Sequence, residues 1–558
     1  MKNGILTFVI IAFVLFSLAP SAYELSRAHT LQSNRQFELV HNFPTDYNFY
    51  LSRIRMGLEG KWTVHEVYTT EQHNGSFIHE FYLLLGKVGA WVRVPSYRPA
   101  DVYHVARIVL ALALLFAIAA WCKRSFEKVV HANTWTMIGF LLVVTASSWP
   151  KLVMMEGVPR FGGYMAWWSV MDSLQRITFI PHLLAGQALM LVIVLAFVSK
   201  MGMKQHSVNI FLGILGFILG MIFPPGLIFV YTTLFVLVLL DWAFEKKTIK
   251  HVIGEWFVPI FGFICVSAPA LVYLLLMTSF YPWKRLAELD ILHPLPFDYL
   301  EYIKAMGPIL PLGLIGAGIA IWKRERRMIP AISWAVAWII LLGVFRFIPS
   351  QSPLRFSEMV PHVALGILGA YVFFSMFTFY AKTHSLRGIS QFASLFLSLG
   401  MIVLGLFHMF SSYLWQKEFV DHKIRAAVPL VPTGSYVMYP LRDFIGAISY
   451  IQNNADRDQI VLSETTAGNY IPVYSGNRVY VGHDNTVNAE QKRVDTTRFF
   501  SGEMSPIVAR EFVRATGASY VFFGPQERED GAVADLARIY PFLRSVYQNA
   551  YVTVYGIL

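Results

Sequence analysis

Eleven long apolar segments constrain this chain more than any other feature of its sequence. A helix needs about 20 consecutive apolar residues to cross the hydrocarbon core of a bilayer. Only 15% of the 558 residues are charged, whereas a soluble domain carries about 25%. The sequence therefore predicts a polytopic α-helical membrane protein of about 11 transmembrane helices, at residues 4–22, 104–122, 134–150, 180–199, 208–223, 225–243, 256–280, 305–322, 329–348, 359–380 and 389–411.

The first segment has two interpretations. Lys2 and the small residues Ala19-Pro20-Ser21-Ala22 are also typical of a cleaved signal peptide. An uncleaved first helix suits a polytopic chain better, and both interpretations place residue 23 and the following residues outside the cytoplasm.

Lysine and arginine in the short connecting loops predict the orientation. Such residues are enriched on the cytoplasmic side of a membrane, whereas the alternate loops here are longer and of mixed charge. The pattern predicts a multi-pass plasma (inner) membrane protein with a cytoplasmic N-terminus, and it accounts for the net charge of +11 without a nucleic-acid partner. The basic loops contain Lys2; Lys123, Arg124 and Lys128; Lys200 and Lys204; Lys246, Lys247 and Lys250; Lys323, Arg324, Arg326 and Arg327; and Lys382 and Arg387.

Two domains follow from this topology. Residues 1–411 form the transmembrane domain, with a large extracytoplasmic loop at 23–103, and residues 412–558 form a small extracytoplasmic α/β domain. In the tail, short apolar runs predict strands and alternate with helical patterns, which is typical of a mostly parallel sheet. The predicted strands are 459–463, 478–481 and 519–523, and the predicted helices are 440–453, 488–500, 505–516 and 532–541.

The large loop contains two predicted helices that would lie along the membrane surface. In residues 46–58 an apolar stripe that includes Tyr47 and Tyr50 recurs at helical spacing. Thr45 is the expected N-cap, and Asp46 in the first turn is favoured by the helix dipole. Residues 79–94 are too short and too charged to cross the bilayer, so they predict a second interfacial helix.

The chain has no nucleotide-binding, zinc-protease or nucleophile-elbow motif, so polar residues at the outer surface are the candidates for chemistry. Asp46 is the first of them. As a general base it would deprotonate a hydroxyl that attacks an electrophilic carbon. The alternative is a first-turn acid with no role beyond the helix.

A polar run in the large loop is the second candidate. We expect Glu66, Glu71, His79 and Glu80, with Tyr50, to position a substrate. Carboxylates and imidazoles also bind divalent metals, but the spacing matches no strong metal signature, so a metal cofactor stays open. For each member a solvated loop is the simpler interpretation.

Two arginines near the starts of later spans are candidates for binding phosphate, and His182 is a candidate for positioning a substrate. Arg176 and His182 flank the start of the fourth span, and Arg355 precedes the tenth. Arginine grips phosphate in a bidentate manner, although long basic side chains also reach toward lipid headgroups in any membrane protein.

Four stretches and the predicted architecture together carry a family resemblance. The stretches are Thr45-Asp46-Tyr47-Asn48-Phe49-Tyr50-Leu51 with Gly57 and Gly60; Tyr103-His104-Val105-Ala106-Arg107; Ser352-Pro353-Leu354-Arg355-Phe356; and Tyr480-Val481-Gly482-His483-Asp484 with Lys492 and Arg498-Phe499-Phe500. The architecture is an uncleaved first helix, a large outer loop with an early acid, many further spans and an outer tail domain. Together these features resemble the GT-C superfamily of membrane glycosyltransferases, in particular protein mannosyltransferases, aminoarabinose transferases and uncharacterised bacterial members.

The resemblance implies a glycosyltransferase that moves a sugar from a polyprenyl-phosphate donor to a hydroxyl of a glycan, lipid or protein at the outer face. Asp46 corresponds to the catalytic acid of the first loop, and Tyr47 replaces the second acid that many relatives have. An inverting displacement would use Asp46 as base, with Arg53, Arg176 and Arg355 on the departing phosphate. In the tail, His483, Asp484 and Lys492 would recognise the acceptor or glycan, or the domain would be a structural cap.

Two other classes of function stay open. A transporter or lipid flippase is the main alternative, although charges in the middle of spans are scarce and no repeated halves are visible. A sensor or assembly protein comes third, because eleven spans exceed what an anchor needs.

Overall fold

The computed structural model describes residues 3–155, 157–199, 206–245, 248–348, 351–379, 387–434, 436, 438–531 and 534–558. Lys2, Lys200, Lys204, Lys246, Lys247 and Lys382 of the predicted basic loops lie outside these ranges. Contacts divide the chain into two compact units. The helical unit comprises Met1–Pro20, Arg107–Tyr273 and His293–Gln416, and the loop–tail unit comprises Ser21–Ala106, Leu274–Leu292 and Lys417–Leu558.

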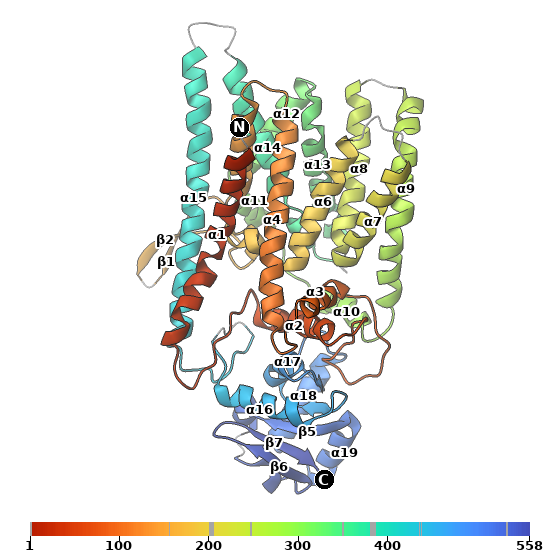
Figure 1. The fold of residues 1–558 in the computed structure, drawn as a ribbon, viewed down its shortest axis with the longest axis vertical. Helices are drawn as coiled ribbons and strands as arrows, with labels where there is room; N and C mark the ends of the chain where they lie inside the picture. Colours follow the sequence, from red (N-terminus) through yellow and green to blue (C-terminus); the bar gives the residue numbers. More distant parts are fainter. Residues whose placement is uncertain are drawn as a thin grey trace. The chain divides into compact units, whose positions relative to one another are not determined.

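Apolar helices dominate the chain (Figure 1). Within the described residues, eight helices are long and apolar enough to cross a membrane, and a bent pair makes a ninth candidate if it counts as one span. The prediction of a polytopic helical membrane protein is confirmed. The longer helices are α1 (Asn3–Arg27), α4 (Pro99–Phe126), α6 (Pro181–Ser199), α8 (Pro224–Glu245), α9 (Ile249–Met277), α13 (Ile329–Val344), α14 (Pro361–Phe379) and α15 (Arg387–Arg425).

The remaining predicted spans are shorter than expected or broken. α5 (Ala132–Val144) and α7 (His206–Ile222) are short apolar helices. The segment predicted as one helix at 305–322 instead covers the end of α11 (Tyr299–Met306) and all of α12 (Ile309–Trp322), and these two helices are bent by 79° relative to each other. Gly307 lies at the bend with φ +65°, and there its α-carbon approaches the Ser147 carbonyl so closely that a Cβ would lie 1.9 Å from it.

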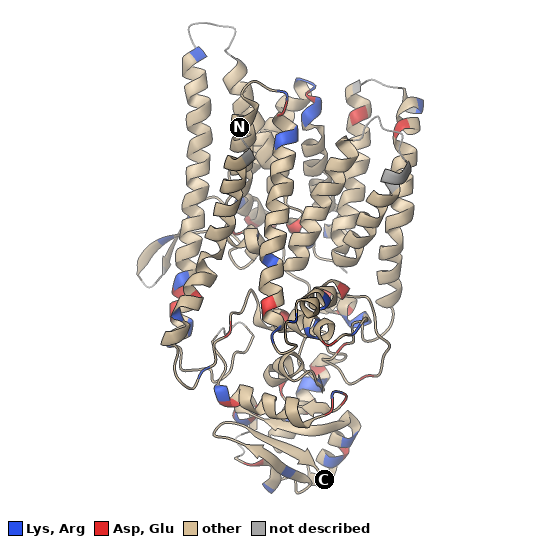
Figure 2. Cartoon of the chain, in the orientation of Figure 1, with Lys and Arg blue, Asp and Glu red and all other residues tan. Residues whose placement is uncertain are grey.

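One end of the helical unit is basic. Figure 2 shows Lys and Arg at the same end of α4, α9, α13 and α15, and the last turn of α4 contains Lys123 and Arg124. The predicted clustering of the described basic residues at one set of helix ends is therefore present. Two loop elements, the β1 (Lys151–Met155) and β2 (Val158–Gly162) strands, form an antiparallel hairpin in this unit.

The loop–tail unit groups the large loop with the tail. Its loop helices are α2 (Pro44–Leu58) and α3 (Glu80–Trp91). Their bounds nearly match those predicted for the two interfacial helices. They cross at Gly57 and Gly86, where a Cβ on either glycine would lie 2.0 Å from a carbonyl oxygen of the other helix. α15 runs unbroken through residue 411, the predicted domain boundary, and α10 (Lys284–Leu292) also belongs to the loop–tail unit.

The tail contains a five-stranded mixed sheet in the order β4-β3-β5-β7-β6. The predicted strands appear as β3 (Ile460–Leu462), β4 (Arg478–Val479) and β5 (Ala518–Phe523), and these three are parallel. β6 (Leu543–Gln548) and β7 (Thr553–Ile557) were not predicted, and β7 pairs antiparallel with both neighbours. The tail helices are α16 (Arg442–Asn454), α17 (Thr465–Tyr474), α18 (Ala489–Phe500), α19 (Pro506–Thr516) and α20 (Pro525–Gly531).

Candidate active site

Asp46 stands in the first turn of α2. The helix begins with Pro44, whose fixed φ suits the first helical position. Phe43 is the residue before the helix and makes no side-chain cap, so the prediction of Thr45 as N-cap is wrong. The Asp46 side chain is 51% exposed. Its carboxylate is thus open to solvent on one side and favoured by the partial positive charge of the helix N-terminus.

His483 from the tail contacts this carboxylate within the loop–tail unit. Its Nε2 lies 3.3 Å from Asp46 Oδ1, and the ring is only 6% exposed. The backbone N–H of Asn485 donates to Nδ1 at 3.1 Å. Because Nδ1 is an acceptor, the proton of the neutral ring is on Nε2, which donates to Asp46. The geometry thus fixes the tautomer of His483 and holds Oδ1 of the Asp46 carboxylate in a hydrogen bond.

The surroundings hold His483 in this position. Its ring stacks on Phe49 of α2 with 4.5 Å between ring centroids. Thr486 Oγ1 donates to the Tyr68 carbonyl at 2.6 Å. Gly468 of α17 and Gly482 lie so close that a Cβ on Gly482 would lie 2.3 Å from the Gly468 carbonyl oxygen. The loop that carries His483 is therefore fixed to both α17 and the segment around Tyr68.

Two asparagines join α2 to α17. Asn48 Nδ2 donates to Asn469 Oδ1 at 2.8 Å, and Asn469 Nδ2 donates to the Thr45 carbonyl at 3.2 Å. Arg55 extends the same junction, since its guanidinium donates to the Val473 and Ser475 carbonyls. The amphipathic pattern predicted one buried stripe on α2, but these contacts bury residues on nearly every side of it.

Arg53 and Glu66 form an ion pair inside the loop–tail unit. Arg53 Nη2 lies 2.5 Å from Glu66 Oε2, and the two side chains are 0% and 4% exposed. The Arg53 guanidinium also lies 3.7 Å from the Phe49 ring centroid. Arg53 was predicted to bind the donor phosphate and Glu66 to position substrate. Their burial and mutual pairing favour a structural role, in which they fix the loop on α2.

Glu71 is paired with Lys492 of α18. The Lys492 Nζ donates to both carboxylate oxygens of Glu71, at 2.8 and 3.0 Å. Burial raises the pKa of Glu71, but the hydrogen bonds from Lys492 and Thr69 outweigh it and hold the pKa below its usual range. Burial lowers the pKa of Lys492 despite this partner. Glu71 is therefore ionised near neutral pH and joins the large loop to the tail through Lys492.

The other predicted positioning residues of the loop lie around α3. Tyr50 stacks on Tyr82 with 4.4 Å between ring centroids. His79 precedes α3 with φ +61°, and its ring packs edge-on against Phe49 at 5.0 Å. Burial raises the pKa of Glu80 to about 7, against the opposing effect of Lys87. Glu80 can therefore change protonation state near neutral pH.

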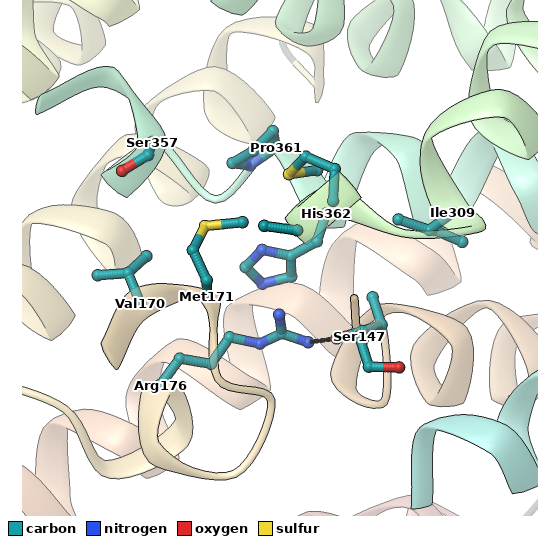
Figure 3. A pocket seen from close by; sticks show the side chains of 11 residues that line it. Ser147, Val170, Met171, Arg176, Ile309, Ser357, Pro361 and His362 are labelled. Carbon is teal, nitrogen blue, oxygen red and sulfur yellow. Dashed lines mark hydrogen bonds between the residues drawn. The ribbon is translucent and has the colours of Figure 1, made fainter. Parts of the chain in front are cut away.

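Arg176 belongs to the helical unit. Its Nη2 donates to the carbonyls of Val143, Val144 and Ala146 at the end of α5, and burial lowers its pKa to about 10. Figure 3 shows its guanidinium pointing toward the ring of His362 in a narrow pocket. The pocket volume is about 10 Å³, which is room for a single water and no phosphate.

Arg355 and His182 are also in the helical unit. Arg355 lies in a 3₁₀ helix, Pro353–Glu358, and is partly exposed. Its charge opposes the effect of burial on Glu358, whose pKa is raised to about 7. His182 is the second residue of α6 and is partly exposed.

Solved structures match the fold described above. An oligosaccharyltransferase from Archaeoglobus fulgidus, tethered to an acceptor peptide, aligns over 94% of this chain and 69% of its own at 12% identity and TM-score 0.53. AglB from the same organism, with an inhibitory peptide and a dolichol-phosphate, aligns over 93% and 69% at 10% identity and TM-score 0.50. The chain has a GT-C fold. ArnT from Cupriavidus metallidurans covers 97% of both chains at 12% identity and TM-score 0.48.

No protein-family model and no curated protein matches the chain. The structural matches establish the GT-C fold. Because the identities are only 10–12%, they establish no catalytic residue. The resemblance seen in the sequence is confirmed at that level.

The described residues of this GT-C fold contain no group of three or more His, Cys, Asp or Glu side chains placed to hold a metal ion. Of the three carboxylates considered for that role, Glu66 and Glu71 are paired with Arg53 and Lys492, and the third is Glu80.

Sequence reasoning missed the partners that hold the site. His483 was a candidate for glycan recognition and not for contact with Asp46, because 437 residues separate them in the chain. Asn48, Arg55 and His362 were not singled out. An ionisable residue beside a proline at the start of a span was the available signal for His362.

Proposed function

We propose that this protein is a glycosyltransferase that moves a sugar from a polyprenyl-phosphate donor to an acceptor hydroxyl, with Asp46 as the general base. One observation carries the proposal: Asp46 presents a half-exposed carboxylate held by the Nε2–H of His483. The GT-C fold supports it, since one solved neighbour is an oligosaccharyltransferase and another is in complex with a dolichol-phosphate.

The proposed step is a single displacement. Asp46 takes the proton of the acceptor hydroxyl as its oxygen bonds to the anomeric carbon. The bond from that carbon to the donor phosphate breaks, polyprenyl phosphate leaves, and the configuration is inverted. Of the three arginines predicted to receive the phosphate, Arg53 and Arg176 are committed to other groups. For Arg355, which is partly exposed, the role on the phosphate stays a prediction from the sequence.

His483 is a positioning residue in this proposal. Its hydrogen bond leaves the second carboxylate oxygen of Asp46 for the substrate proton. The acceptor is a glycan, lipid or protein, and the donor enters from the plasma (inner) membrane.

The test is release of polyprenyl phosphate from a panel of polyprenyl-phosphate sugars by the purified protein. A general base contributes about 10²–10⁴-fold, so Asp46→Asn should lower turnover by that factor. Asp101→Asn is the matched control, because Asp101 is also a first-turn acid and 47% of its side chain is exposed.

Three outcomes would overturn the proposal. They are no release with any donor, equal turnover in wild type and Asp46→Asn, or equal losses in the two variants. Passage of the lipid across a proteoliposome membrane without transfer would favour the transporter alternative.

A further inference from the structure

A second cavity in the helical unit lies among the basic ends of its helices. It has a volume of about 380 Å³ and is lined by α4, α6, α8 and α13 and the turn before α13. Its walls include four cationic side chains, Arg124, Lys128, Arg326 and Arg327, but only two carboxylates, Glu127 and Asp241. The lining therefore has a formal charge of +2, from four cations and two anions.

The two acids of the lining are already paired. Arg124 lies 2.5 Å from Glu127, and Arg326 lies 3.5 Å from the 1% exposed Asp241. Arg327 is held by Glu325, which is not in the lining, at 2.6 Å. Among the described residues no carboxylate lies within 4.0 Å of Lys128. Lys128 is thus the cation of the lining whose charge no described carboxylate offsets.

Ser125 supplies an independent observation. It lines the cavity, is 1% exposed, and its Oγ has no hydrogen-bond partner among the described residues. A buried hydroxyl without a hydrogen-bond partner destabilises the folded protein. Such a group is expected where a ligand supplies the missing acceptor or donor.

The rest of the wall is apolar. Trp121, Leu195, Val198, Leu237 and Ile329 line the same space. A ligand that satisfies both parts of the lining has an anionic head and a hydrocarbon chain. Basic pockets between transmembrane helices bind anionic lipid headgroups in this way.

We propose that this cavity binds an anionic phospholipid, with the phosphate near Lys128, Arg327 and Ser125 and an acyl chain along the apolar wall. The site is built from residues other than those of the proposed active site and does not depend on the proposed function. Free phosphate has the same headgroup chemistry, and the test separates the two sources.

The experiment measures the melting temperature of the full-length protein in detergent with short-chain phosphatidylglycerol, short-chain phosphatidylcholine or inorganic phosphate. We expect phosphatidylglycerol to stabilise the wild type. One cation near an anionic lipid contributes about 1 kcal/mol, or about fivefold in affinity. Lys128→Gln should therefore weaken binding about fivefold, and Lys128→Gln with Arg327→Gln about 25-fold.

Lys323→Gln with Arg324→Gln is the matched control, because these residues belong to the same basic end but do not line the cavity. Ser125→Leu, which fills the cavity, should abolish the stabilisation even if it alters the basal melting temperature. Equal stabilisation by phosphatidylcholine or by inorganic phosphate would overturn the proposal. So would an equal loss of affinity in the control and the Lys128 variants.

Discussion

Asp46 and Arg176 were both predicted from the sequence to act in the active site, but their surroundings in the structure differ. Asp46 is half exposed and accepts a hydrogen bond from one neutral ring. Arg176 donates to carbonyls at the end of α5 and lines a pocket of about 10 Å³. The comparison shows that the groups already bonded to a charged side chain decide whether it is available for substrate.

Arg53, like Arg176, is already bonded to another group, and replacing it should give the largest loss of stability. Removing one partner of a buried ion pair costs about 3–5 kcal/mol, because the other charge stays uncompensated. Arg53→Met should therefore lower the melting temperature strongly, and adding Glu66→Leu should recover much of the loss. A stable Arg53→Met protein with a raised KM for donor would instead make Arg53 a substrate ligand.

Arg176→Gln tests the other side of the comparison. The α5 carbonyls would lose a charged donor, and such hydrogen bonds contribute about 1.5–3 kcal/mol. We expect a lower melting temperature with the KM for donor unchanged. Thermal melting and donor-dependence kinetics on one preparation check this. A raised KM at unchanged stability would contradict the structural role.

His483→Phe should lower kcat about tenfold, corresponding to about 1.4 kcal/mol, since the ring can still stack on Phe49 but has no N–H for Asp46. His483→Gln, which retains a donor, should restore part of the rate. A purely structural role would predict equal losses of kcat in both variants and a lower melting temperature in each.

The pH dependence of Glu80 is the smallest expected effect. Its pKa is raised from 4.5 to about 7 in the folded state. The folded protein then holds the proton more tightly, so stability falls as the pH rises from about 4.5 through 7. Because Glu80 is partly exposed, we expect at most about 1 kcal/mol.

Melting curves of the wild type and Glu80→Gln between pH 4.5 and 8 measure this effect. The variant should be the more stable protein above pH 7 and should show a flatter profile. Identical profiles would mean that Glu80 stays ionised in the folded protein.

Hydropathy predicted the helical membrane part of the fold well, because a spanning helix must be apolar along its length. It did not predict the 79° break between α11 and α12, where Gly307 contacts a carbonyl far away in the chain. In the tail, β6 and β7 were missed. β6 begins Leu543-Arg544-Ser545-Val546, which does not alternate between apolar and polar residues, and it is exposed along much of its length, so its apolar signal is weak.

The candidate site was predictable only in part. Asp46 was found because an acid in the first turn of a loop helix has a local signature. Its partner His483 and the Asn48–Asn469 junction depend on contacts across more than 400 residues. The role of Arg53 as a phosphate ligand came from the resemblance to the GT-C superfamily, whereas its pairing with Glu66 was not visible in the sequence.

The most direct test of Asp46 as the base is rescue of an emptied carboxylate site. Turnover of Asp46→Ala should fall at least about a hundredfold, and formate should restore part of it in a concentration-dependent manner, because the half-exposed site admits a small carboxylate. Formate should leave wild type unchanged. Wild-type turnover in Asp46→Ala, with or without formate, would contradict the assignment of Asp46 as the base.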